Sequence, residues 1–257
     1  MTARVLITRE VGSWPALASR FASSALVLQW SPTTTQVAPL DPRPGDAAIS
    51  RLDQYDWLVA TSGRGVDALM SLMSLRGMTR LPERLRVAAV GPATAAAFAS
   101  KDVAVAEVAG EASVKGLAVS LSPQVVSGER VLIVRPEGAT SALSASLRAA
   151  GARVDEAPLY RTVASDAAPE LATAAIEGAF AAVAFTAPSA ATLWLDAAGP
   201  GRGLLVDALL RVRRVAIGAT TEACLASLRL PADAVAEAPT AEAVGDAIAR
   251  ALPSFAC

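Results

Sequence analysis

Two stretches of the chain, "RVLITRE" from Arg4 to Glu10 and "RVLIVRPEG" from Arg130 to Gly138, are nearly the same. In each, a short run of Val, Leu and Ile is followed by a polar turn that begins with an arginine. Such a run is typical of a strand that is covered on both faces in a parallel sheet. The occurrence of the same strand-and-turn sequence at two distant places in the chain indicates an internal duplication.

Three further blocks repeat in the same order and at nearly the same distance. "DWLVATSGRGV" at 56–66 matches "AAVAFTAPSAA" at 181–191, and "RVAAVGPATAAAF" at 86–98 matches "RVAIGATTEACL" at 214–225. A weaker pair sets "EASVKGLAVSL" at 111–121 against "APTAEAVGDAI" at 238–248, with Ser113 opposite Thr240. The 257 residues therefore divide into two similar units, each long enough to bury a core of its own.

Each unit has the pattern of an α/β fold. The apolar runs are followed by turns of Gly, Pro, Ser or Thr and then by alanine-rich helical stretches such as "PATAAAFAS" at 92–100. Strand, tight turn and helix in repetition predict a doubly wound parallel sheet. Folds of this kind bind ligands beyond the carboxyl ends of the strands, where helix N-termini offer unpaired N–H groups.

The composition narrows the functional class. The apolar share is 53% but only 4% of the residues are aromatic, and each apolar run is interrupted before it reaches the length of a membrane helix. The chain enters a strand pattern at Arg4 with no leader pattern before it, so secretion is not expected. Cys224 is expected to be a buried small side chain and Cys257 a tail residue, and two such cysteines fit a reducing, cytoplasmic setting.

Charge and histidine content exclude further classes. A net charge of −1 provides no field that would collect nucleic acid. The chain has no histidine, and no spacing of cysteines or carboxylates suggests a metal site. Neither dinucleotide nor P-loop glycine patterns follow a strand, which counts against a nucleotide-binding enzyme. We therefore expect no cofactor.

The turns after the strands hold the candidate ligand-binding residues. Their small residues let a ligand approach the backbone, and their hydroxyls either cap a helix or bind the ligand. Arg9 and Arg135 occupy equivalent positions of the duplication, and Arg64 lies in a turn, although each arginine alone also fits a solvated surface charge. The candidates are Arg9, Thr61, Ser62, Gly63, Arg64, Gly91, Thr94, Arg135, Gly138, Thr186, Ser189, Gly218, Thr220 and Thr221.

The ordered set of motifs resembles the uroporphyrinogen-III synthase family over essentially the whole chain. It comprises "VLITR", "TSGRGV", "AVGPATAAAF", "GERVLIVRPEGA", "GARVDEAPLYRT", "FTAPSA", "AIGATTEACL" and "APTAEAV". No single motif is very specific, but their order and spacing are. The sequence departs from the family at Gly63 and Ala219, where the family often has Pro, and at Ala187, where it often has Ser.

The resemblance implies that the two units exchange their first strands. The strand at Arg4 would then belong with the C-terminal blocks, giving one discontinuous domain of residues 1–36 and 165–257 and an inserted domain of residues 37–164. The chain would cross between them in the proline-bearing stretches 31–45 and 156–170, which we expect to pair as a two-stranded connector.

The resemblance also implies a reaction. The family closes hydroxymethylbilane, a linear tetrapyrrole, into uroporphyrinogen III with ring D inverted, and needs no cofactor. Tyr160 matches the family's active-site tyrosine, although it also fits a packed aromatic side chain of a connector. The protein would then be a cytoplasmic monomer in transient contact with the upstream hydroxymethylbilane synthase. It would bind neither nucleic acid nor a membrane. The alternative is a non-catalytic two-domain protein that binds a small molecule.

Overall fold

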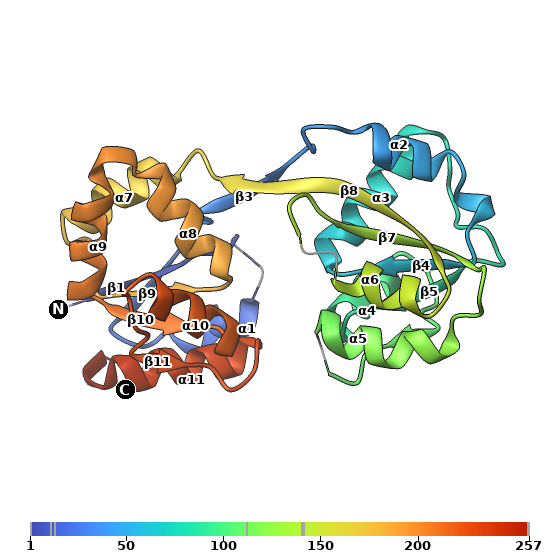
Figure 1. Cartoon of the computed structure of the whole chain (residues 1–257). Helices are drawn as coiled ribbons and strands as arrows, with labels where there is room; N and C mark the ends of the chain where they lie inside the picture. The colour runs from blue at the N-terminus through green and yellow to red at the C-terminus, as the bar shows by residue number, and fades with distance from the viewer. Residues whose placement is uncertain (1, 11, 13, 112, 140–141, 256–257) are drawn as a thin grey trace. The chain divides into compact units, whose positions relative to one another are not determined.

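The computed structural model describes residues 2–10, 12, 14–111, 113–139 and 142–255. The chain forms two compact units. Unit 1 comprises residues 1–35 and 163–257, and unit 2 comprises residues 36–162 (Figure 1). The chain therefore passes twice between them, once within β3 (Thr34–Val37) and once within β8 (Arg153–Ala164).

Unit 2 is built on a six-stranded sheet in the order β3-β8-β7-β4-β5-β6. Besides β3 and β8, this sheet contains β4 (Trp57–Ala60), β5 (Arg86–Ala89), β6 (Glu107–Val108) and β7 (Arg130–Pro136). All pairs from β8 to β6 are parallel. Its helices are α2 (Arg43–Ile49), α3 (Gly63–Leu75), α4 (Pro92–Ala99), α5 (Val114–Leu121) and α6 (Ala142–Ala149), with 3-10 turns at Leu52–Gln54 and Ser122–Gln124.

Helices cover both faces of this sheet, as its apolar strands require. Successive residues of β4 point to opposite faces: Trp57 and Val59 pack with α5 and α6, whereas Leu58 and Ala60 pack with α2, α3 and α4. Trp57 is only 1% exposed and belongs to the core. The unbroken apolar run "WLVA" follows from burial on both sides.

Unit 1 has a five-stranded sheet in the order β11-β10-β9-β1-β2, with every pair parallel. Its strands are β1 (Ala3–Ile7), β2 (Leu26–Trp30), β9 (Ala182–Phe185), β10 (Arg213–Ala216) and β11 (Ala234–Val235). Its helices are α1 (Pro15–Arg20), α7 (Ala168–Ile176), α8 (Pro188–Ala197), α9 (Arg202–Arg211), α10 (Ala219–Ser227) and α11 (Ala241–Ala251), with 3-10 turns at Gly199–Gly201 and Pro253–Phe255. Leu17 of α1 and the buried face of α11 cover one side, while α7, α8 and α9 cover the other, where Trp194 is fully buried.

The two sheets repeat one strand order. Reading β11-β10-β9-β1-β2 beside β6-β5-β4-β7-β8 sets β1 opposite β7, the two strands with the duplicated sequence. The matched hydroxyls also behave alike, because Ser113 accepts a hydrogen bond from the Gly116 N–H and Thr240 accepts one from the Ala243 N–H at the starts of α5 and α11. The strand nearest the N-terminus, β1, thus lies in one sheet with β9, β10 and β11 from the C-terminal part of the chain.

Candidate functional site

The turn between β4 and α3 carries the best-defined polar contact at the carboxyl edge of the sheet in unit 2. The Ser62 Oγ accepts a hydrogen bond from the Gly65 N–H at 3.0 Å and so caps α3. The same oxygen lies 2.8 Å from the phenol oxygen of Tyr160. The structure therefore brings together two residues that stand 98 positions apart in the sequence.

A register shift in β8 sets the place of Tyr160. Arg135 of β7 pairs with Pro158, but the next residue, Pro136, pairs with Tyr160, so Leu159 is the extra residue of a β-bulge. The Glu137 N–H then donates to the Tyr160 carbonyl at 2.7 Å. Tyr160 is 6% exposed, so its ring is packed while its oxygen remains at the edge of the sheet.

A cavity of about 220 Å³ opens at this edge. Polar groups of Ser62, Arg135, Ser144 and Tyr160 line it together with apolar side chains such as Ile133. The volume would admit a single small ring with its substituents. The mixture of apolar walls and a few polar groups is typical of a site that orients a small molecule.

The guanidinium of Arg135 is held by the half-buried carboxylate of Glu156. Its Nε donates to Glu156, and Ser144 donates its hydroxyl to the other carboxylate oxygen. Burial acts to raise the pKa of Glu156, but the hydrogen bonds from Ser144 and Arg135 and the charges of Arg135 and Arg148 outweigh it, so the pKa is lowered. Sequence reasoning missed Ser144 and Glu156, because nothing in their local motifs distinguishes them.

The other candidates of unit 2 occupy the same edge. In the amide orientation that satisfies both groups, the Gln36 oxygen accepts from Arg64 at 2.8 Å and 3.3 Å. Gly138 has a φ of +77°, a conformation that favours glycine, and it lies in the turn after β7. The Thr61 N–H donates to the Val134 carbonyl.

The turn between β5 and α4 provides two further candidates. Gly91 is the N-cap residue of α4, and Thr94, in the first helical turn, donates its N–H to the Gly91 carbonyl. Thr94 is only 4% exposed and so packs at the base of the turn, although a presented side chain was expected. The Thr94 side chain is therefore largely withdrawn from solvent.

The turn after β9 forms the corresponding edge of unit 1. The Thr186 Oγ1 donates to the Thr8 carbonyl at 2.9 Å, and the Thr186 N–H donates to the Thr8 Oγ1 at 3.0 Å. Ala187 stands where unit 2 has Ser62, so α8 has no side-chain cap. Ser189 is half-buried in the first turn of the same helix. The two edges are thus built alike but differ in their N-cap residues.

The remaining candidates of unit 1 differ in exposure. The Arg9 guanidinium lies over the Trp14 ring, 4.5 Å from its centre. Gly218 is the N-cap residue of α10, Thr220 is exposed, and Thr221 is 2% exposed, so Thr221 repeats the burial of Thr94.

The expectation for Cys224 was wrong. This side chain is half-buried, because α10 turns it toward the Pro188 carbonyl at 3.8 Å and not into the core. Burial nonetheless raises the pKa of its thiol. Cys257 lies outside the described residues.

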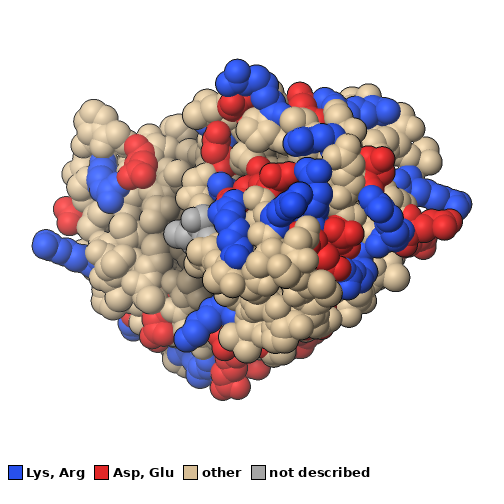
Figure 2. Space-filling model, turned by 45° about the vertical axis from the view of Figure 1, so that its right-hand side comes forward, with Lys and Arg blue, Asp and Glu red and all other residues tan. Residues whose placement is uncertain are grey.

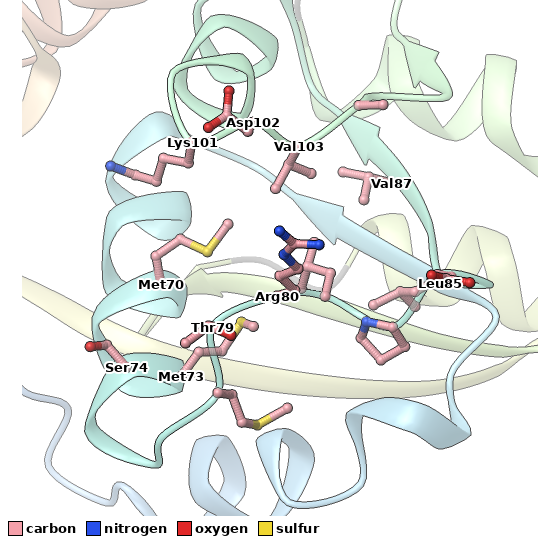
Figure 3. A pocket seen from close by; sticks show the side chains of 15 residues that line it. Met70, Met73, Ser74, Thr79, Arg80, Leu85, Val87, Lys101, Asp102 and Val103 are labelled. Atoms are coloured by element: carbon pink, nitrogen blue, oxygen red, sulfur yellow. The ribbon is translucent and has the colours of Figure 1, made fainter.

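A larger cavity of about 770 Å³ lies at the opposite end of unit 2 (Figure 3). Its lining includes Met73 in the last turn of α3 and Leu85 just before β5, so it opens at the amino ends of the strands. Arg80, Lys101 and Asp102 lie there with apolar side chains (Figure 3). Glu83 also lines the cavity. The opposing charges select no ligand, and the cavity lies away from the Ser62 and Tyr160 pair.

Charges are mixed over the visible face of the molecule, where Figure 2 shows Lys and Arg interspersed with Asp and Glu. Among the described residues, no group of three or more Cys, Asp or Glu side chains could hold a metal ion. Within the same residues, no helix is long and apolar enough to cross a membrane.

The fold and its edges define a class: a duplicated, doubly wound α/β protein that gathers small polar residues beyond the carboxyl ends of its strands. A family model described as uroporphyrinogen-III synthase HemD matches residues 21–245. The chain belongs to the uroporphyrinogen-III synthase family.

Individual relatives agree with this assignment. The chain is 29% identical over 177 residues to the uroporphyrinogen-III synthase of Synechococcus elongatus, covering 68% of this chain and 66% of that protein. It is 31% identical over 175 residues to a putative uroporphyrinogen-III synthase of Methanothermobacter thermautotrophicus, covering 66% of this chain and 68% of that protein. The fold resembles a crystal structure of a mutant uroporphyrinogen III synthase from Thermus thermophilus, with a TM-score of 0.68, 21% identity and coverage of 98% and 100% of the two chains.

Proposed function

We propose that this protein converts hydroxymethylbilane into uroporphyrinogen III, closing the macrocycle with ring D inverted. Membership of the family supports the reaction. The observation that carries the proposal in this chain is the phenol of Tyr160, which lies 2.8 Å from Ser62 at the carboxyl edge of unit 2 and lines a small cavity there. A phenol O–H can assist a hydroxyl group to leave, which is the first requirement of the reaction.

The chemical task of the site is to generate and orient a reactive cation. As the terminal C–O bond of the substrate breaks, Tyr160 gives its proton to the departing oxygen and water leaves. The pyrrole nitrogen supplies the electron pair that stabilises the resulting azafulvene cation. Ring D must then attack through its substituted carbon, so the site has to hold that ring in one orientation. The apolar wall around Ile133 and the polar groups opposite it are suited to this role.

The carboxylates of the substrate are met by local groups. Helix N-termini in the turns after β4 and β5 direct N–H groups outward and carry a partial positive charge. The arginines at these edges add charge, but Arg64 and Arg135 already contact Gln36 and Glu156. Recognition is therefore shared among several weak contacts.

The test is to incubate the protein with freshly generated hydroxymethylbilane and to separate the isomers. Spontaneous closure yields the symmetric isomer I, so enzymatic activity appears as isomer III above that background. A non-catalytic binding protein would leave only isomer I. That result would refute the proposed function, whatever the affinity for the substrate.

Two substitutions of Tyr160 then separate chemistry from packing. Tyr160→Phe keeps the ring and removes the O–H, so we expect normal folding and a fall in turnover on the order of 10²–10³-fold with little change in binding. Tyr160→Ala would also lower the melting temperature, because the ring is buried. Full activity of Tyr160→Phe would remove Tyr160 from the chemistry.

A further inference from the structure

The contact between Ser62 and Tyr160 has a direction that the helix cap restricts. The Gly65 N–H can only donate, so the Ser62 Oγ must accept that bond, at 3.0 Å. Capping uses one of the two acceptor positions of the hydroxyl and leaves its single proton available. The Ser62 side chain can therefore serve the helix and Tyr160 at the same time.

Two arrangements of protons fit the 2.8 Å distance between the two oxygens. If Tyr160 donates to Ser62, its only proton is used and cannot reach a substrate. If Ser62 donates to Tyr160, the phenol proton remains available to the cavity that both side chains line. A donor bonded to the phenol oxygen would also stabilise the negative charge that develops there when the proton is given away.

The backbone of Tyr160 is fixed independently of this bond. The β-bulge at Leu159 shifts the register of β8, and the Glu137 N–H holds the Tyr160 carbonyl at 2.7 Å. Bulges of this kind often occur beside active sites, where they redirect a side chain. Tyr160 is thus held at two places: its backbone pairs with the end of β7, and its phenol oxygen contacts Ser62 in the turn before α3.

We propose that Ser62 is a positioning residue, which donates its hydroxyl proton to the Tyr160 oxygen and thereby directs the phenol proton toward the substrate. The inference rests on the proposed function. In the reaction the phenol proton passes to the leaving hydroxyl, the C–O bond breaks and water departs. The phenolate oxygen then accepts the Ser62 hydrogen bond until the proton released from the substrate on ring closure returns to it.

Three single variants test the idea. Ser62→Ala removes the donor, and we expect kcat for isomer III to fall on the order of 10–100-fold while KM changes less than about threefold. Ser62→Thr keeps the hydroxyl and should recover most of the activity. Ser113→Ala is the matched control, because Ser113 caps α5 through Gly116 in the same way at 2.9 Å. It should lower the melting temperature about as much as Ser62→Ala and leave kcat unchanged.

A double-mutant cycle decides whether Ser62 acts through Tyr160. If it does, Ser62→Ala should have no further effect on kcat in the Tyr160→Phe background. Additive effects, or a loss confined to KM, would overturn the inference and make Ser62 a substrate contact or a simple helix cap. A wild-type protein without isomer III would instead refute the function itself, and a fully active Tyr160→Phe would refute the role of Tyr160. These failures are therefore distinguishable.

Discussion

Replacing Glu156 by Gln would remove the negative charge that holds Arg135 at the cavity, and the contacts of Glu156 determine the expected effect on stability. The carboxylate side chain is 14% exposed and accepts hydrogen bonds from Ser144 and Arg135. Gln offers one acceptor oxygen and directs an NH2 group at the other donor. One charge-assisted hydrogen bond is therefore lost, together with the electrostatic attraction of Arg135 and Arg148 to the carboxylate. A bond of this kind contributes about 1.5–3 kcal/mol, and we expect the free energy of unfolding to fall by about 2–3 kcal/mol at neutral pH.

The pH dependence of this effect has a definite sign. The pKa of Glu156 is lowered in the folded protein, so its contribution is fully present above the ordinary pKa of a glutamate, about 4.3. It is lost as the pH falls through the lowered pKa, because the folded carboxylate then becomes protonated. The gap between wild type and Glu156→Gln should therefore be widest at neutral pH and should narrow below about pH 4.

Urea unfolding at pH 7 and at a series of pH values below 4.5 measures both quantities. Glu83→Gln is the control, since Glu83 is exposed, and its effect should stay within about 0.5 kcal/mol at every pH. A Glu156→Gln protein as stable as wild type at pH 7, or a gap that widens in acid, would contradict the reasoning. The same variant should retain isomer III formation if Arg135 serves only to bind carboxylates.

Three further outcomes are expected. Arg214→Ala should lower the free energy of unfolding by about 3–5 kcal/mol, because this guanidinium is buried and bonds four carbonyl groups and a carboxylate. The neighbouring Arg213→Ala loses one ion pair whose guanidinium is exposed and should lower it by less than about 1 kcal/mol. Equal shifts of the two variants in thermal melts would argue against this. Burial, together with the hydrogen bond to the Asp155 carboxylate, raises the pKa of Tyr55 to about 12. The contribution of the phenol to stability is therefore complete below about pH 10 and is lost between about pH 10 and about pH 12. The melting temperatures of wild type and Tyr55→Phe should converge over that range, and a constant difference would refute this. Replacement of Arg9, Arg64 or Arg135 by Ala should each weaken apparent substrate binding by no more than about 1–2 kcal/mol, since each guanidinium already has a partner in the protein. A thousandfold increase in KM from any one of these changes would show that a single ion pair dominates recognition.

Much of the fold could be predicted, because a strand that is buried on both faces of a sheet has an unbroken apolar sequence. β1, β4, β5, β7, β9 and β10 are the strands predicted in this way. β2, β6 and β11 were not predicted. β6 and β11 have only two residues each, too few to form a pattern. The exchange of β1 and β7 was implied by the resemblance, because a repeat in the sequence does not say which copy of a strand joins which sheet.

The site was predictable at the level of turns but not of contacts. Helix N-termini after parallel strands gather at one edge, so Ser62 could be placed there from the sequence alone. Its bond to Tyr160 depends on a one-residue bulge, and the capture of Arg135 by Glu156 depends on the register between β7 and β8. Such features arise from tertiary geometry, and local sequence carries no signal for them.

The exchanged first strands also determine the order in which the chain can fold during its synthesis. β1 can pair with β2 at once, but its other edge waits for β9, since Thr8 bonds the Ala184 carbonyl across 176 positions. All six strands of the sheet of unit 2 leave the ribosome before β9 does. An apolar strand edge thus stays unpaired throughout the completion of another sheet, which makes the nascent β1-α1-β2 segment the place where this chain is most exposed to misassembly.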